Sequence, residues 1–258
     1  MNEEEKMTIT KHMKKIDLRE YPDIKEVRCC GLGLKEIILS ENLEVLYCDN
    51  NELVEIECNK KLKKLFCRNN RLIDIKINDE LETLFCDENL LSELNLSKTL
   101  KFLMCSHNIL NKLDTNDELK TLICDHNMLS NLVLKDPLKF LKCNNNHLEK
   151  LSLNDSLEIC ICSFNRIDQI RVNDKLKELY CGNNFITEID QKKLKIIHCP
   201  NNYISEFIPN EELVKLNIMN NNLKEFKCNE KLEVLSIDFY PNKNKRLLKM
   251  AVAGSLVS

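Results

Sequence analysis

Leucine and other apolar residues recur with one spacing from about residue 24 to residue 238 of this chain. The pattern is LxxLxCxxNxLxxLxLN followed by two residues before the next leucine, so one repeat has 19 residues. The repeats begin at Ile24, Leu43, Leu62, Leu81, Leu100, Leu119, Leu138, Leu157, Leu176, Leu194, Leu213 and Leu232. Only the interval from Leu176 to Leu194 differs, because it has 18 residues. A period of this size predicts a solenoid of about twelve stacked turns.

Strand alternation explains the first half of each repeat. In the segment VLYCD, residues 45–49, alternation puts Leu46 and Cys48 on one face and the other three residues on the opposite face. Leu46 and Cys48 can reach the same interior as Leu43 only if the chain turns back after each strand. The repeat therefore predicts a parallel sheet whose apolar face lines the core.

The second half of each repeat must return the chain to the start of the next strand. About nine or ten residues remain for this return, which is too few for a full α-helix and two turns. We expect an extended or 3₁₀-like return segment, with Leu53, Ile56 and Cys58 packing inward.

Asparagine occupies the bend after each predicted strand, where its side-chain amide can satisfy backbone groups that the turn buries. This column consists of Asn51, Asn70, Asn89, Asn108, Asn127, Asn146, Asn165, Asn184, Asn202 and Asn221. A second asparagine, as in Asn59 and Asn78, is expected to serve the turn into the next strand. The chain has only 4 Gly and 5 Pro, so asparagine is the residue expected to form its turns.

These repeats resemble the leucine-rich repeat family. Its consensus LxxLxLxxNxL is matched at Leu43, Leu46, Cys48, Asn51 and Leu53, and at the equivalent positions of nearly every other repeat. The length of 19 residues and the CxNN motif are similar to the short repeats of bacterial and large-virus proteins. The resemblance implies a mostly β member of the α/β-type repeat solenoids, a right-handed coil with a concave parallel sheet and a column of stacked asparagines.

The same pattern sets the expected domain organisation. We expect an N-terminal cap over residues 1–23, the solenoid over 24–238, and a C-terminal cap or tail over 239–258. Ile16 and Leu18 are candidates for a degenerate additional turn.

Composition narrows the function classes. The net charge of −3 comes from 38 basic and 41 acidic residues spread along the chain, so we expect no nucleic-acid partner. The N-terminus has no apolar signal-peptide core, and no stretch has the length of a membrane span. We therefore expect a cytoplasmic protein without a membrane partner, whose 14 cysteines are free thiols.

The regular cysteines are interpreted as small buried apolar residues. Their strand position faces the core, and Ile218 and Ile237 occupy it in the last repeats. The only close pairs are Cys29 with Cys30 and Cys160 with Cys162, and we expect each pair to point to opposite or poorly matched faces of its strand. Alternation turns Cys30 outward, so it is the thiol expected to be reactive.

No catalytic motif interrupts the repeats. We expect no catalytic residue, no metal site and no cofactor, and therefore no enzyme. Because both flanks of the solenoid are short, we expect no catalytic domain of the kind that some bacterial repeat proteins carry.

Function is therefore sought on the outward strand positions of the concave sheet, where apolar residues recur from turn to turn. The predicted partner-binding residues are Val45, Tyr47, Phe66, Phe85, Phe102, Met104, Ile123, Phe140, Ile161 and Tyr180. Aromatic and methionine side chains with charged neighbours, here Asp49, Arg68, Asp87 and Asp125, have the composition of an interface core.

Three alternatives remain open. The stripe can serve sheet stability alone, because β-strands favour such residues and cross-strand pairs stabilise a sheet. It can be buried against a second copy, which would make the protein a self-associating scaffold or homodimer. The chain can also be a secreted or virus-encoded effector that targets host proteins. The leading hypothesis is a non-catalytic module that binds an unidentified partner protein through the concave face.

Overall fold

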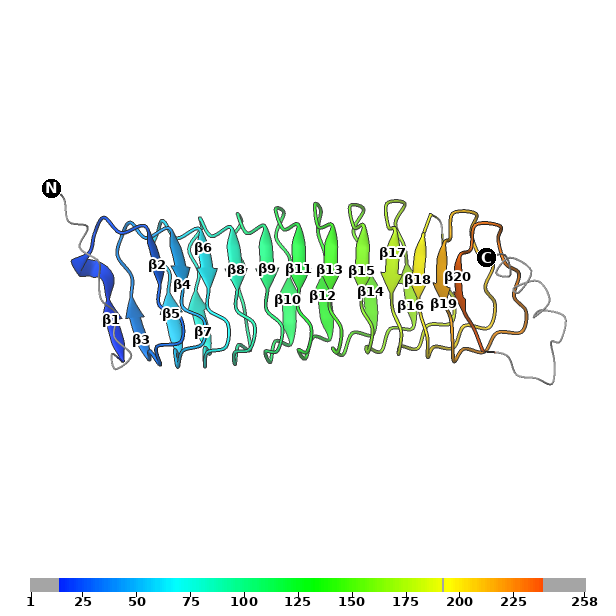
Figure 1. Cartoon of the computed structure of the whole chain (residues 1–258), viewed down its shortest axis with the longest axis horizontal. Coiled ribbons are helices and arrows are strands. Elements are labelled where there is room, and N and C mark those ends of the chain that lie inside the picture. Colours follow the sequence, from blue (N-terminus) through cyan, green and yellow to red (C-terminus); the bar gives the residue numbers. More distant parts are fainter. Residues whose placement is uncertain (1–13, 192, 239–258) are drawn as a thin grey trace, which may run out of the picture. The chain divides into compact units, whose positions relative to one another are not determined.

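The computed structural model describes residues 14–191 and 193–238 (Figure 1). The chain divides into two units, Met1–Asn111 and Lys112–Ser258, and each is described by itself. The expected N-terminal cap is described only from residue 14, and the expected C-terminal cap lies outside the described residues.

In both units the LxxLxC segments form three-residue strands of a parallel sheet, called the main sheet below. In the first unit these strands are β2 (Glu26–Arg28), β4 (Val45–Tyr47), β6 (Lys64–Phe66), β8 (Thr83–Phe85) and β9 (Phe102–Met104). In the second unit they are β11 (Thr121–Ile123), β13 (Phe140–Lys142), β15 (Ile159–Ile161), β17 (Glu178–Tyr180), β18 (Ile196–His198), β19 (Lys215–Asn217) and β20 (Val234–Ser236).

The register of the main sheet follows the sequence repeat. Each strand residue pairs with the residue one repeat later, as Leu46 does with Leu65. Leu179 pairs with Ile197, so the 18-residue repeat keeps the register and its missing residue falls in the return segment. The sequence period therefore predicts the strand pairing correctly.

The return segments are extended, as expected. The return strands are β3 (Glu36–Ile38), β5 (Glu55–Glu57) and β7 (Asp74–Lys76) in the first unit, and β10 (Lys112–Asp114), β12 (Asn131–Val133), β14 (Lys150–Ser152) and β16 (Gln169–Arg171) in the second. The 3₁₀ form expected as the other possibility occurs, within the described residues, only at η1 (Leu18–Glu20), ahead of the main sheet.

The core of each turn is built from the leucines of the repeat. Leu46, Leu53 and Leu65 have no exposed surface, and Ile56 is 2% exposed. Cys58 departs from the expectation, because it is only half-buried beside the return strand. Side chains that follow the return strand lie nearer the surface than the strand's own central residue.

The asparagine column forms the expected ladder. Nδ2 of Asn89 donates to the carbonyl oxygens of Cys67 at 3.0 Å and Cys86 at 3.0 Å, and Oδ1 accepts from the backbone N–H of Leu72 at 3.0 Å. One side chain thus satisfies buried backbone groups of its own turn and of the preceding one. The same geometry recurs around Asn51 and Asn165.

The second asparagine closes the turn into the next strand. Nδ2 of Asn59 donates to the Leu43 carbonyl at 3.0 Å, and its Oδ1 accepts from the backbone N–H of Lys61 at 2.9 Å. The structure therefore confirms the role expected for this residue.

An additional turn precedes the first full repeat. Strand β1 (Lys15–Asp17) pairs in parallel with β3, and Ile16 lies opposite Ile37. Ile16 and Leu18 are buried, so they hold the positions of a return strand and its continuation. These residues cover the apolar end of the first repeat.

Candidate functional site

The main sheet of the first unit carries a stack of aromatic rings on its outward face. Tyr47 and Phe66 are stacked, with ring centroids 4.5 Å apart and planes 3° from parallel. Phe66 meets Phe85 edge to face at 5.0 Å. The guanidinium of Arg28 lies 4.0 Å from the centre of the Tyr47 ring. Because in-register strands place equivalent residues side by side, one aromatic column forms without any contribution from loops.

The structure places all ten predicted residues on main-sheet strands, but it exposes them less than the pattern suggests. Phe102 is 42% exposed. The other nine residues are half-buried, namely Val45, Tyr47, Phe66, Phe85, Met104, Ile123, Phe140, Ile161 and Tyr180. Neighbouring rings and aliphatic chains cover part of each other, so some of this apolar surface stabilises the sheet itself.

In the second unit the column is less continuous. Lys142 lies between Ile123 and Ile161 in the sheet. Its ammonium group pairs with Asp125 at 2.7 Å. Further along, the Tyr180 hydroxyl donates to Glu178 at 3.0 Å, and burial raises the pKa of Tyr180. The second unit therefore presents separate apolar segments with polar groups between them.

The acidic residues expected to flank the interface form hydrogen bonds with the backbone of the next turn. Asp49 accepts a hydrogen bond from the backbone N–H of Arg68 at 2.7 Å, and Asp87 accepts one from Ser106 at 2.9 Å. Burial raises the pKa of Asp87, which lies in the bend after its strand. These carboxylates fasten one turn to the next, so their presence is explained without a partner.

A second apolar row was not predicted. It follows the asparagine ladder, where the chain leaves the bend, and its side chains are more exposed than most outward apolar side chains of the main sheet. In the first unit it contains Val54, Ile73, Leu90 and Ile109, and in the second Met128, Phe185 and Tyr203. We call this set the rim row. The repeat position directly after the ladder asparagine holds five of its seven members, namely Leu90, Ile109, Met128, Phe185 and Tyr203.

The core cysteines are unsuited to nucleophilic or metal chemistry. Cys48 and Cys67 have no exposed surface, and burial raises the pKa of each thiol well above its ordinary value. The Cys48 thiol donates to the carbonyl oxygen of Phe66 at 3.4 Å, and Cys29 does the same to Tyr47 at 3.4 Å. A cysteine in this column is thus a small apolar residue that also shares a backbone acceptor.

One expectation about the cysteine pairs is wrong. Cys160 and Cys162 do not point to opposite faces, because residues two apart on a strand share a face and both are fully buried. Cys160 takes the place that leucine has in most other repeats. Cys29 and Cys30 do point to opposite faces, and Cys30 is exposed as expected. Cys228 is exposed as well, which the pattern did not indicate.

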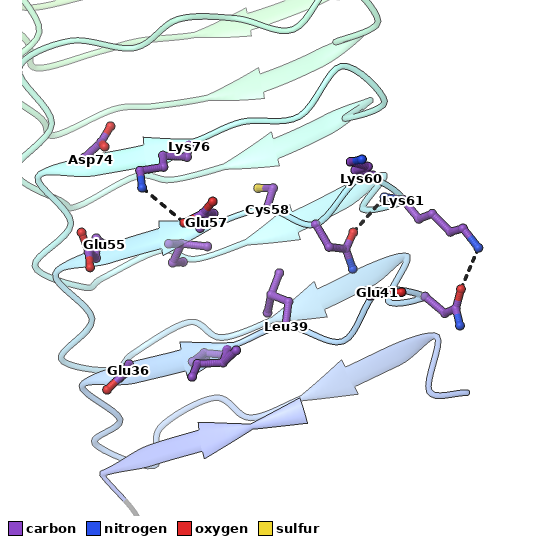
Figure 2. Close-up of a pocket in the computed structure, with 15 residues that line it drawn as sticks. Glu36, Leu39, Glu41, Glu55, Glu57, Cys58, Lys60, Lys61, Asp74 and Lys76 are labelled. Atoms are coloured by element: carbon purple, nitrogen blue, oxygen red, sulfur yellow. Dashed lines mark hydrogen bonds and ion pairs between the residues drawn. The ribbon is translucent and has the colours of Figure 1, made fainter. Parts of the chain in front are cut away.

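A hollow of about 760 Å³ lies beside the return strands of the first unit (Figure 2). Its wall carries Glu55 and Asp74, which are opposite each other in register, and Glu57, which pairs with Lys76 at 3.2 Å. Cys58 lies in the same wall. The hollow is an open groove with charges of both signs, unlike the enclosed apolar cavities in which small molecules usually bind.

The described residues contain no cluster of three or more histidine, cysteine or carboxylate side chains placed to hold a metal ion. Within residues 14–191 and 193–238, the structure also has no helix with the length and hydrophobicity of a membrane span.

No protein-family model and no curated protein matches the chain. Solved structures do. The functional domain of InlJ from Listeria monocytogenes, which includes a cysteine ladder, matches with a TM-score of 0.75 and 24% identity over 83% of this chain and 53% of that chain.

Two structures of YopM are also similar. YopM from Yersinia enterocolitica WA-314 has a TM-score of 0.64 and 20% identity, over 85% of this chain and 66% of that chain. YopM from Yersinia pestis, a leucine-rich effector protein, has a TM-score of 0.64 and 24% identity, over 83% of this chain and 60% of that chain. The chain thus has the leucine-rich repeat fold and spans between about half and two thirds of these three chains.

Proposed function

We propose that the chain is a non-catalytic protein-interaction module that binds a partner protein through the outward face of its main sheet. The observation that carries this proposal is the aromatic column Tyr47, Phe66 and Phe85, which stands on outward positions that the core does not need. Large aromatic side chains in such positions are typical of interface cores, since they bury much apolar area at low cost in conformational entropy.

The absence of catalysis belongs to the same proposal. Burial raises the pKa of the core thiols of Cys48, Cys67 and Cys86 well above the ordinary value, which favours the unreactive thiol form. The cytoplasmic location stays a prediction, because one similar structure belongs to an effector protein.

A capture experiment with matched variants tests the proposal. The tagged chain is used to capture proteins from a lysate of its own organism, and the double variant Phe66→Arg with Phe85→Arg is compared with it. We expect the variant to lose the captured partner while the fold is retained, because two charges then occupy the centre of the aromatic column. Circular dichroism of the variant checks the fold.

The matched control is Ile73→Arg with Leu90→Arg, which places the same charges on the rim row of the same unit. The proposal predicts that this control still captures the partner. We call Phe66→Arg with Phe85→Arg the main-sheet variant and Ile73→Arg with Leu90→Arg the rim variant. If the main-sheet variant still captures the partner and the rim variant does not, the partner binds the rim row and the proposal is contradicted.

Self-association is the competing function, because an apolar face can also bury itself against a second copy. The proposal predicts a monomer of 30.2 kDa in solution. A sedimentation measurement that gives a dimer in the wild type and a monomer in the main-sheet variant would instead support a scaffold.

A further inference from the structure

The main sheet of the second unit is bordered by a column of lysines. We call Lys120, Lys139, Lys177 and Lys195 the lysine edge; each takes the second position of its repeat. The backbone N–H of Lys139 donates to the Lys120 carbonyl at 3.0 Å, and that of Lys195 donates to Lys177 at 2.8 Å. Two pairs of like charges thus lie on directly adjacent turns.

Two carboxylates stand in this column, Glu158 between the lysine pairs and Glu233 two strands beyond Lys195. Glu158 lies 3.4 Å from the Lys139 ammonium and 2.6 Å from that of Lys177, and these contacts hold its pKa below the ordinary value. Within the described residues, Lys120 and Lys195 form no ion pair. The edge therefore keeps an excess of positive charge, although the whole chain has a net charge of −3.

The first unit uses the same column differently. Glu44 pairs with Lys25 at 3.8 Å and with Lys63 at 2.9 Å, and Glu82 pairs with Lys101 at 3.1 Å. Charges of opposite sign alternate there and support the strand register. The alternating charges of the first unit are thus explained by the stability of the fold. Adjacent like charges destabilise a sheet, so fold stability does not explain why lysines lie next to each other in the lysine edge.

Apolar side chains lie beside the lysine edge. Phe140 directly follows Lys139 and Ile196 directly follows Lys195, whereas Ile159 follows Glu158. All three lie on the outward face of the main sheet and are half-buried. On the far side of the sheet face Asp125 is buried, with its charge used by Lys142 and by the backbone N–H of Asn144 at 2.7 Å. Glu178 lies between Ile159 and Ile196 in the sheet, and its carboxylate accepts a hydrogen bond from the Tyr180 hydroxyl at 3.0 Å. The face therefore has apolar residues interrupted by Glu178, a basic border and no free carboxylate in the bend beyond it.

The distance between neighbouring lysines of the edge matches the rise per turn of a bound helix better than the residue spacing of a bound extended peptide. Neighbouring strands lie about 4.8 Å apart, close to the ~5.4 Å rise of one helical turn. Residues on one side of an extended peptide recur every ~6.7 Å, so an extended peptide loses register with the lysines within two or three strands.

Resting on the proposed function, we propose that the main sheet of the second unit binds an acidic amphipathic helix of a partner protein. Its apolar stripe lies on Phe140, Ile159 and Ile196, and its carboxylates pair with the lysine edge.

Binding of a fluorescent helical peptide of about 18 residues, with a leucine stripe beside a glutamate stripe, tests this inference. The full chain is titrated against this peptide, against a version with glutamine in place of glutamate, and against a scrambled version of equal composition. We expect the glutamate helix to bind at least about tenfold more tightly than either comparison peptide, and salt to weaken it.

Variants of the chain complete the test. Lys177→Gln with Lys195→Gln is expected to weaken the glutamate helix about tenfold, whereas Lys25→Gln with Lys63→Gln in the first unit changes binding less than about twofold. Phe140→Ser with Ile159→Ser is expected to abolish it, with thermal unfolding of every variant measured in parallel.

The alternatives are separable. Equal binding of all three peptides, or no effect of the lysine variants, overturns the acidic helix, and the proposed function then rests on the capture experiment alone. Equal binding of the scrambled peptide overturns the helical form of the partner segment. Failure of every peptide to bind, together with capture that depends on Phe66 and Phe85, overturns this inference and leaves the proposed function standing.

Discussion

Phe164 shows how a single residue can depart from the repeat without disturbing it. It has a φ of 57°, in the left-handed region, and its ring is 54% exposed. Asparagine holds the same position in other turns, where Nδ2 of Asn201 donates to Asn183 and Nδ2 of Asn220 donates to Asn201. Asparagine tolerates this backbone region far better than a bulky residue does.

The substitution Phe164→Asn is therefore expected to stabilise the protein by about 1 kcal/mol, through relief of backbone strain. Urea unfolding measures the change. Phe185→Asn is the control, since it removes an exposed ring from the rim row where no positive φ occurs. Destabilisation by Phe164→Asn would show that the ring makes contacts that outweigh the strain.

The cysteines give a second test at the residue scale. Burial raises the pKa of Cys29 to about 12, and raises those of Cys48 and Cys86 well above the ordinary value. Near pH 8 these thiols are protonated as well as inaccessible. Cys30 and Cys228 are exposed, and partial burial raises the pKa of each thiol.

Iodoacetamide at about pH 8, followed by peptide mass spectrometry, is expected to label Cys30 and Cys228 in the folded protein, and faster as the pH rises toward their pKa values. In denaturant all 14 cysteines should react. Labelling of Cys67 or Cys143 in the native state would contradict the buried column.

At the scale of elements, the aromatic column has two possible uses that differ in energy. If it serves the sheet, the ring pair of β4 and β6 contributes to stability. We expect Tyr47→Ala and Phe66→Ala to show a coupling of about 0.5 to 1.5 kcal/mol in a double-mutant cycle, because the rings are stacked at 4.5 Å. Chemical unfolding of the two single variants and the double variant gives this value. A coupling near zero would mean that the stack in the structure contributes nothing to the sheet.

Much of each element could be predicted from the repeat. The alternation of Leu46 and Cys48 with Tyr47 determines which side chains face the core, and the constant period predicts the register of Leu46 with Leu65. The exposed fraction of Phe66 could not be predicted, because it depends on how its ring rotates between Tyr47 and Phe85.

The acidic neighbours show the same limit. Asp49 and Asp87 look like free charges in the sequence, and only the side-chain geometry reveals that they cap backbone N–H groups of the next turn. The rim row is different. Leu90 and Ile109 share one repeat position that can be read from the sequence, although their exposure depends on the direction in which the chain leaves the bend.

At the scale of the molecule, two apolar surfaces compete for the role of interface, the main sheet and the rim row. The main sheet is half-buried and built from in-register strands, whereas the rim row is more exposed and comes from bends. Preformed surfaces on regular strands lose little entropy on binding, and this favours the main sheet as the site of recognition.

Hydroxyl-radical footprinting of the protein alone and in complex with its captured partner compares these surfaces directly. The account predicts that oxidation of Phe66, Phe85 and Met104 on the main sheet falls several-fold in the complex, while Ile73 and Leu90 on the rim row stay as reactive as in the free protein. Protection of the rim row with an unchanged main sheet would contradict the central claim.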